Sequence, residues 1–160
     1  DRKLLRARQI YLAVSRRNRT ICRMGEYLLR VQGSFFRGGF LTGMTYKMFA
    51  DELEVHESTV CRIVSNKYVS CPQGILPLKY FFSKGVDVVD GQGRVTGTMG
   101  KSSVRELIAF LIEKEPGDRP YSDGMLADML KKEYGLRISR RTVSNYREEA
   151  GIRSVYERKV

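Results

Sequence analysis

Ten residues near the C-terminal end of the chain, at positions 139–148, read SRRTVSNYRE. Ser is favoured immediately before the first turn of a helix, which predicts a helix that begins at Arg140. Arg can donate two parallel hydrogen bonds to guanine and Asn can pair in the same way with adenine, while Ser and Thr can bond a base or a phosphate. The composition favours a helix that reads bases in the major groove of DNA. A solvated helix with an Arg-rich face is the alternative that composition leaves open.

The net charge points to the same class of partner. The 160 residues include 29 Lys and Arg against 18 Asp and Glu, a formal net charge of +11. Such an excess favours an anionic partner, and nucleic acid is the first candidate. The excess is concentrated in residues 1–40, which carry ten cations and two anions. This basic segment can follow phosphates, meet an acidic protein surface or serve as a solubilising face.

A second helical pair is predicted at about residues 45–66. Thr45 suits the position before a helix that runs through Leu53, and another helix is expected from His56 or Glu57 to about Asn66. The apolar spacing is that of a helix-turn-helix. Polar residues that can bond bases or phosphates project from the first turns of the second helix: Glu57, Ser58, Thr59 and Arg62. Alternatively, Glu57 and Ser58 complement the N-terminus of the helix and its dipole.

The rest of the chain also has a helical pattern. A helix is expected from Leu4 to about Arg17, and another that resumes at Arg19 with a core stripe at Ile21, Met24, Leu28, Val31 and Phe35. Three further helices are expected in residues 102–160. The first has a capping box of Ser103 and Glu106, the second starts at Ser122 and stops at Gly135, and the last has Val143 and Tyr146 inward.

Residues 85–101 are glycine-rich, nearly neutral and without clear apolar periodicity, which predicts a flexible linker. We therefore expect an all-α fold with two small helical domains, residues 1–84 and 102–160, each containing a helix-turn-helix and joined by this Gly-rich linker. Two small DNA-binding domains joined by one flexible linker can reach separated DNA elements.

Several classes of protein are disfavoured by the same sequence. Cys22, Cys61 and Cys71 have no zinc-site spacing with His56, and no catalytic constellation is visible, so we expect no metal, no cofactor and no enzymatic activity. His56 is better explained as a cap or packing residue. Free thiols, no signal peptide and no apolar run of about 18 residues predict a cytoplasmic protein that does not enter the membrane. The start at Asp1 without Met suggests a piece of a longer protein.

Two sets of motifs resemble one bacterial family. The C-terminal stretch is similar to the RpoN box of sigma-54 (RpoN-type) transcription initiation factors, ARRTVAKYRE, with Ser139, Ser144 and Asn145 as the differences. Upstream, four segments follow the sigma-54 pattern HESTVSR, NKY, PxGI and LKYFFS in the same order: residues 56–62, 66–68, 72–75 and 78–83. Cys61 replaces a Ser of that pattern, and Pro77 takes a place commonly held by Glu, which suits only the start of a helix. The resemblance covers essentially the whole chain.

The resemblance implies roles for individual residues. The box helix would read a GG-containing upstream (minus-24) promoter element through Arg140, Arg141 and Arg147, with Ser139, Thr142, Asn145 and Tyr146 in support. The first helix-turn-helix would lie near a GC-containing downstream (minus-12) element, with Arg62 as the leading candidate, followed by Glu57, Ser58, Thr59 and Lys67.

The resemblance also implies partners. These are double-stranded promoter DNA, RNA polymerase core and an AAA+ activator ATPase, which acts mostly through a region that is not in this chain and whose ATP hydrolysis allows promoter opening. The location would be the bacterial cytoplasm, at the nucleoid. A recombinase or transposase targeted by helix-turn-helix modules, and a stand-alone repressor, are the alternatives. The first would require a nucleophile or metal-binding carboxylates, and the second predicts no affinity for polymerase core.

Overall fold

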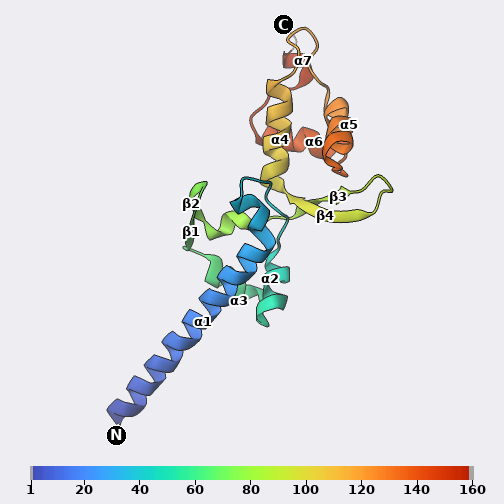
Figure 1. The fold of residues 1–160 in the computed structure, drawn as a ribbon. Coiled ribbons are helices and arrows are strands. Elements are labelled where there is room, and N and C mark those ends of the chain that lie inside the picture. The colour runs from blue at the N-terminus through green and yellow to red at the C-terminus, as the bar shows by residue number, and fades with distance from the viewer. Residues whose placement is uncertain (1, 159–160) are drawn as a thin grey trace.

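The computed structural model describes residues 2–158, which form seven α-helices, one short 3-10 helix and two antiparallel sheets of two strands each (Figure 1). In chain order the elements are α1 (Arg2–Phe36), α2 (Tyr46–Leu53), α3 (Glu57–Val64), β1 (Tyr68–Cys71), β2 (Gly74–Pro77), η1 (Leu78–Phe81), β3 (Gly85–Val89), β4 (Val95–Gly100), α4 (Lys101–Glu113), α5 (Asp123–Tyr134), α6 (Arg140–Glu149) and α7 (Val155–Arg158). The expected predominance of helix is confirmed, but the fold is not all-α because two segments form β-hairpins. Asp1, Lys159 and Val160, at the ends of the two predicted domains, lie outside the described residues.

Helix α1 is one continuous helix of 35 residues, not the two predicted segments. The polar run between those segments contains neither Gly nor Pro, so nothing interrupts the helical hydrogen bonds there. The chain leaves the helix at Gly38, whose φ of 87° is accessible mainly to glycine. Residues 2–19 are exposed and project away from the rest of the molecule (Figure 1).

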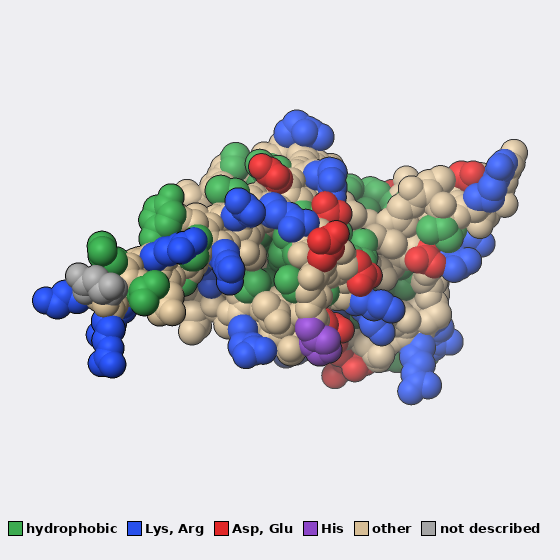
Figure 2. Space-filling view, turned by 90° about the horizontal axis from the view of Figure 1, so that it is seen from below, with side chains coloured by type: hydrophobic (Ala, Val, Ile, Leu, Met, Phe, Trp, Pro, Cys, Tyr) green, Lys and Arg blue, Asp and Glu red, His purple; other side chains and the backbone are tan. Residues whose placement is uncertain are grey.

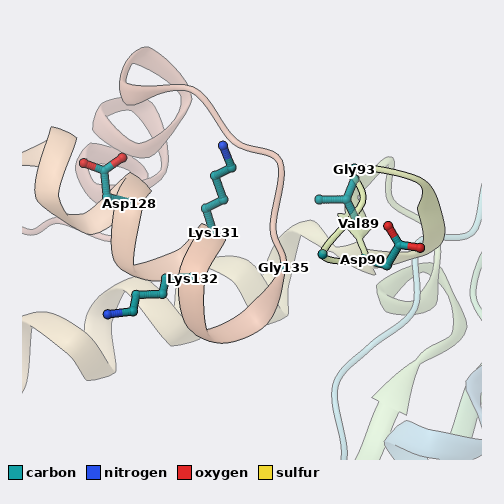
Figure 3. A pocket seen from close by; sticks show the side chains of 8 residues that line it. Val89, Asp90, Gly93, Asp128, Lys131, Lys132 and Gly135 are labelled. Atoms are coloured by element: carbon teal, nitrogen blue, oxygen red, sulfur yellow. The ribbon is translucent and has the colours of Figure 1, made fainter.

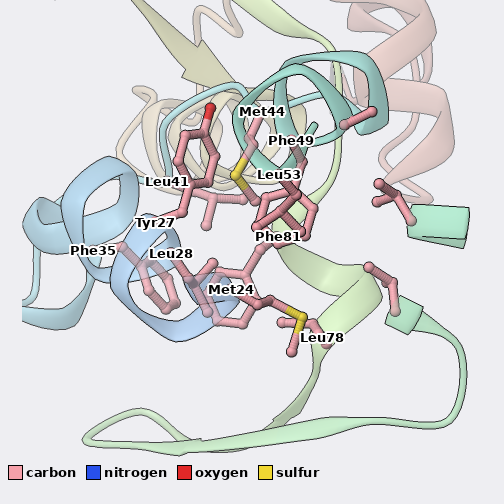
Figure 4. Close-up of a cluster of buried hydrophobic side chains, with 13 residues drawn as sticks. Met24, Tyr27, Leu28, Phe35, Leu41, Met44, Phe49, Leu53, Leu78 and Phe81 are labelled. Carbon is pink, nitrogen blue, oxygen red and sulfur yellow. The ribbon is translucent and has the colours of Figure 1, made fainter. Parts of the chain in front are cut away.

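The second half of α1 supports the first hydrophobic core. The predicted stripe is confirmed from Met24 onward, with Leu28 and Phe35 also buried, whereas Ile21 remains 37% exposed. Helix α1 also contributes Tyr27. The later parts of the chain contribute the remaining buried residues of this cluster (Figure 4): Leu41, Met44, Phe49, Ala50, Leu53, Val60, Val64, Leu78 and Phe81. Helices α2 and α3 are therefore fixed to α1 by apolar packing.

A short turn separates α2 from α3. Thr45 caps α2 as predicted, because its hydroxyl accepts a hydrogen bond from the backbone N of Met48 at 3.3 Å. Glu54 ends α2 in the left-handed conformation, with φ 55° and ψ 44°. Glycine is the usual residue there, so the turn geometry is kept at some cost in backbone strain. Helix α3 then begins at Glu57, within the predicted range.

The first hairpin and η1 close the same core. Strands β1 and β2 pair in register from Tyr68 opposite Pro77 to Cys71 opposite Gly74. Pro77 immediately precedes η1, as its fixed φ favours, although the helix that follows is a 3-10 turn of four residues.

Residues 85–101, predicted to be a flexible linker, form a second hairpin and the start of α4 instead. Strands β3 and β4 pair along their length, with a bulge near the tip. At the tip, the Asp90 carboxylate accepts hydrogen bonds from the backbone N atoms of Gln92 and Arg94, both at 2.9 Å. Gly93 adopts a φ of 78° in this turn. The Val and Thr residues alternating with these glycines favour strand, and the glycines serve the turn and close packing rather than mobility.

Helices α4, α5 and α6 surround the second hydrophobic core, with the second hairpin against it. Its buried members are Met99, Val104, Leu107, Ile108, Leu111, Leu126, Ala127, Leu130, Leu136 and Val143. Ser122 caps α5 and Gly135 ends it, as predicted. The predicted capping box is wrong, because α4 begins at Lys101. Ser103 is buried instead, and its hydroxyl accepts a hydrogen bond from the backbone N of Leu41 at 2.8 Å.

A buried glutamine ties the loop after α1 to that helix. Gln32 is fully buried; its Nε2 donates to the carbonyl of Thr42 at 2.8 Å, and the backbone N of Thr42 donates to its Oε1 at 2.9 Å. The side-chain amide thus satisfies both backbone groups of Thr42 on the side facing α1.

Replacement of Gln32 by Leu is expected to lower the free energy of unfolding by about 1 to 3 kcal/mol, because the backbone groups of Thr42 lose their partners. Gln9→Leu, in the exposed half of α1, is the matched control, with an expected change within about 0.5 kcal/mol. Urea unfolding followed by circular dichroism measures both variants. Equal stabilities of the two variants would contradict this role of Gln32.

Candidate nucleic-acid interface

Helix α6 carries the SRRTVSNYRE stretch, and Ser139 caps it as predicted. The Ser139 hydroxyl accepts a hydrogen bond from the backbone N of Thr142 at 3.2 Å and lies 2.9 Å from the Thr142 Oγ1. Val143 is fully buried and anchors the helix in the second core, also as predicted. Between this cap and this anchor, Arg140 and Arg141 are left at the surface.

The exposed face of α6 carries side-chain donors that have no partner in the part of the chain that the structure describes. Within residues 2–158, the guanidinium groups of Arg140 and Arg141 make no hydrogen bond and no ion pair. Asn145 lies one turn after Arg141 on the same face and is exposed. The three predicted side chains that can pair with guanine or adenine are therefore gathered on one open surface.

Arg147 does not share this surface, although the sequence predicted a DNA contact for it. Its side chain is buried; Nε donates to Asp123 Oδ1 at 2.8 Å, and one terminal nitrogen donates to the carbonyl of Ile152 at 2.6 Å. The other terminal nitrogen contacts Asp123 and Ser144. All three guanidinium nitrogens are therefore engaged within the protein, and a DNA contact would have to compete with these bonds. Arg147 instead joins α6 to the first turn of α5.

The second half of α6 is held against the start of α4. Lys101 Nζ lies 2.8 Å from Glu149 Oε2 and 5.1 Å from the centre of the Tyr146 ring, and Arg105 lies 3.4 Å from the same carboxylate. The hydrogen bond from Lys101 lowers the pKa of Glu149 below its usual value, and the charges of Lys101 and Arg105 act in the same direction. Tyr146 is half-buried, with Lys101 over its ring.

The start of α3 forms a second polar surface. His56 is the cap of this helix, as expected, since its Nδ1 accepts a hydrogen bond from the backbone N of Ser58 at 3.2 Å. Glu57 and Ser58 are exposed on the first turn. Arg62 is exposed one turn later, and its Nε donates to the carbonyl of Ser58 at 3.3 Å. The two terminal nitrogens of Arg62 remain available to a ligand.

A basic hollow of about 460 Å³ lies beside Arg62, between α1 and α3. Its lining brings together three cations and two hydroxyls, from Arg17, Arg62, Lys67, Thr20 and Thr59. Such groups suit a backbone phosphate. No motif in the sequence pointed to Arg17 or Thr20, which are far from α3 along the chain. The basic content of residues 1–40 was the single available signal.

The projecting part of α1 continues this positive surface. Figure 2 shows Lys and Arg side chains spread along it with hydrophobic side chains between them, whereas Asp and Glu side chains gather nearer the middle of the same face. Residues 2–19 contain seven Lys or Arg and neither Asp nor Glu. The charge excess seen in the sequence is thus displayed mainly along one helix.

A further hollow offers no comparable set of groups. It measures about 590 Å³ and lies between the tip of the second hairpin and the C-terminal half of α5 (Figure 3). Asp128 and Lys132 belong to its lining, yet both side chains point away from the hairpin in Figure 3. Charged groups do not converge there on one ligand position.

In the part of the chain that spans residues 2–158, no group of His, Cys, Asp and Glu side chains is placed to hold a metal ion. None of the helices in this part of the chain combines the length and apolar character that a membrane span requires.

The structure is a mainly helical protein with two exposed polar surfaces whose side chains are of the types that bind nucleic acid. The family model described as "Sigma-54, DNA binding domain" matches residues 1–160. The chain belongs to this sigma-54 family, in agreement with the motif resemblance.

Individual relatives agree with this assignment. The RNA polymerase sigma-54 factor of Acinetobacter guillouiae is 34% identical over 160 residues, which are 99% of this chain and 32% of that protein. The factor of Escherichia coli K12 is 34% identical over 155 residues, 96% of this chain and 31% of that protein. The crystal structure of Aquifex aeolicus sigmaN bound to promoter DNA is similar with a TM-score of 0.67 and 33% identity, over 97% of this chain and 45% of that chain. The chain spans about a third of the length of these curated relatives.

Replacement of Arg147 by Ala is expected to lower the free energy of unfolding by about 3 kcal/mol, because Asp123 is left without its cation in a partly buried site. Arg140→Ala removes the same side chain from the exposed face of the same helix and is expected to change stability by less than about 0.5 kcal/mol. Chemical denaturation of both variants gives the comparison. A small, equal effect of the two substitutions would rule out the structural role of Arg147.

Proposed function

We propose that this chain is the promoter-reading part of a sigma-54 transcription initiation factor and binds double-stranded DNA through two helix-turn-helix readers. One reader is α5–α6 within residues 102–160, and the other is α2–α3 within residues 1–84. The observation that carries the proposal is the pair of exposed guanidinium groups of Arg140 and Arg141, which have no partner among the described residues and stand at the start of a capped and anchored helix.

The upstream element of the promoter is assigned to α6. A reading helix approaches base edges with the residues of its first turns, where Arg140 and Arg141 stand. Two Arg side chains that can each bridge O6 and N7 of a guanine suit a GG-containing minus-24 element. Asn145 supplies an amide for a neighbouring base, and the paired hydroxyls of Ser139 and Thr142 lie at the helix start, where a phosphate is favourably bound. Tyr146 lies at the edge of this surface and would support these contacts.

The downstream minus-12 element is assigned to α3 and the basic hollow beside it. Arg62 is the leading candidate for a base contact, with Glu57, Ser58 and Thr59 in the first turn of the helix. Lys67 and Arg17 line the hollow and would bind the adjacent phosphates. The phosphate contacts would position the protein on the duplex, while the base contacts of α3 would carry the sequence information.

The partners of the whole protein follow from its family. We propose that the complete factor binds RNA polymerase core, directs it to minus-24/minus-12 promoters in the bacterial cytoplasm at the nucleoid, and depends on an AAA+ activator for promoter opening. The curated relatives carry the name RNA polymerase sigma-54 factor, which supports this assignment. The proposal requires no cofactor and no enzymatic activity of this chain.

Fluorescence anisotropy with four duplexes tests the proposal: one with both elements, one with the upstream element alone, one with the downstream element alone, and one scrambled. We expect the order of affinity to follow the number of elements, with a gap between specific and scrambled DNA that persists as salt is raised. Equal affinity for all four duplexes would refute the proposed function. A pull-down with polymerase core separates a sigma factor from a repressor, which would not be retained.

Arg140→Ala and Arg141→Ala are each expected to weaken binding to the GG-containing duplex by about 1 to 3 kcal/mol and to relax discrimination at the GG positions. Arg119→Ala removes the same charge from the exposed loop between α4 and α5 and should act weakly and equally on all sequences. Titrations on matched and scrambled duplexes make the comparison. Equal losses on both duplexes would reduce Arg140 and Arg141 to phosphate contacts.

Arg62→Ala is expected to reduce protection of the downstream element in a hydroxyl-radical footprint while protection of the upstream element persists. The reason is that α3 loses the side chain best able to donate to guanine. Lys79→Ala removes an exposed cation of η1 and serves as the control, with no expected change in the footprint. Unchanged protection of the downstream element by Arg62→Ala would remove this residue from the interface.

A further inference from the structure

The two proposed readers are connected by an ordered junction. This junction consists of residues 41–44, Ser83, the β3–β4 hairpin and the first turn of α4. Thr42 forms an antiparallel bridge with Met99, and Met44 forms one with Ser83, whose carbonyl accepts a hydrogen bond from the Met44 N at 3.1 Å. Residues 41–44 are thus paired to the segment that leads into the second core, not separated from it by free chain.

Leu41 is a buried residue that contacts both halves of the molecule. Its side chain is fully buried in the first core. Its backbone N donates to the hydroxyl of Ser103 on α4 at 2.8 Å, and its carbonyl accepts a hydrogen bond from the backbone N of Gly100. Ser103 is 3% exposed, so a relative displacement of the two halves would leave buried polar groups without partners.

The strands of the junction also touch backbone to backbone. A Cβ added at Gly43 would lie 2.5 Å from the Cα of Gly85, and one added at Gly85 would lie 2.6 Å from the Cβ of Thr98. No side chain separates the two segments at this crossing. Neither glycine has a positive φ, so the need for glycine arises from close approach alone.

The junction continues to both reading helices. On one side, Thr42 is held by Gln32 of α1, and Thr45, directly after the junction, caps α2. On the other side, the hairpin pairs with the turn that precedes α6. Val88 forms a bridge with Leu136, and the side chains of Arg137 and Asp87 form an ion pair at 2.6 Å. An unbroken series of hydrogen bonds and packed residues therefore joins α2–α3 to α5–α6.

We propose that the junction holds α3 and α6 in one relative orientation and thereby selects the spacing between the two DNA elements, with Gly43, Gly85 and Ser103 as the spacing-determining residues. This inference rests on the proposed function. One added base pair moves an element by about 3.4 Å along the duplex and turns it by roughly 35° around the axis. A rigid pair of readers cannot follow that change, whereas readers on a flexible tether would tolerate it.

The test uses the 160-residue chain and a series of duplexes in which the interval between the two elements varies by single base pairs. Affinity should peak at one interval and fall at least about tenfold on either side, as simultaneous engagement is lost. A flat profile, combined with specific binding to each single-element duplex, overturns the spacing inference alone. Failure to distinguish single elements from scrambled DNA would instead overturn the proposed function.

Variants at the junction extend the test. Gly43→Ala forces the crossing segments apart, and Ser103→Ala removes the partner of the Leu41 N with less disturbance, so it remains informative if Gly43→Ala does not fold. Each is expected to keep its affinity for single-element duplexes and to flatten the spacing profile several-fold. Gly91→Ala is the matched control in the same hairpin, because its added Cβ meets no atom within 4 Å, and its profile should stay sharp. Sharp profiles in all three folded variants would overturn the proposed role of these residues.

Discussion

The backbone of residues 41–44 is extended, so its polar groups form their hydrogen bonds outside any helix. The arrangement of both halves of the molecule depends on these hydrogen bonds. Gln32 satisfies this backbone from the side of α1, while Thr98, Gly100 and Ser103 satisfy it from the side of the second hairpin and α4. The same four residues contribute Leu41 and Met44 to the first core. One short stretch of strand thus orients α2 and α3 on one side and the second core on the other.

In helix α6, the proposed reading helix, some arginine side chains are paired within the protein and others are exposed. Arg147 is buried with Asp123, and the cations at the start of α4 are paired with Glu149. These contacts fix the rotation of α6 about its own axis. The first turn is left with two guanidinium groups that have no partner within residues 2–158. Charge on one helix is therefore divided between holding the helix in place and binding DNA in the proposed complex.

Local patterns in the sequence predicted the helical elements well, because a cap and an apolar period act over a few residues. Thr45, Ser122 and Ser139 each cap a helix in the structure, and Gly135 ends one. The second hairpin was not predicted because its glycines are also typical of linkers. In addition, strand pairing depends on partners that are distant in sequence. The break expected near Arg17 was wrong because the polar run there still permits a helix.

The sequence by itself determined where most helices begin, which stretch carries side chains that can pair with bases, and the family to which the chain belongs. Those properties follow from residue identity and short spacing. Tertiary structure alone decided that Arg147 is buried while Arg140 and Arg141 are exposed, that Arg17 joins Arg62 and Lys67 around one hollow, and that the supposed linker is a paired hairpin. Burial, convergence of distant charges and strand pairing are set by contacts between segments far apart in the chain, so no local pattern could specify them.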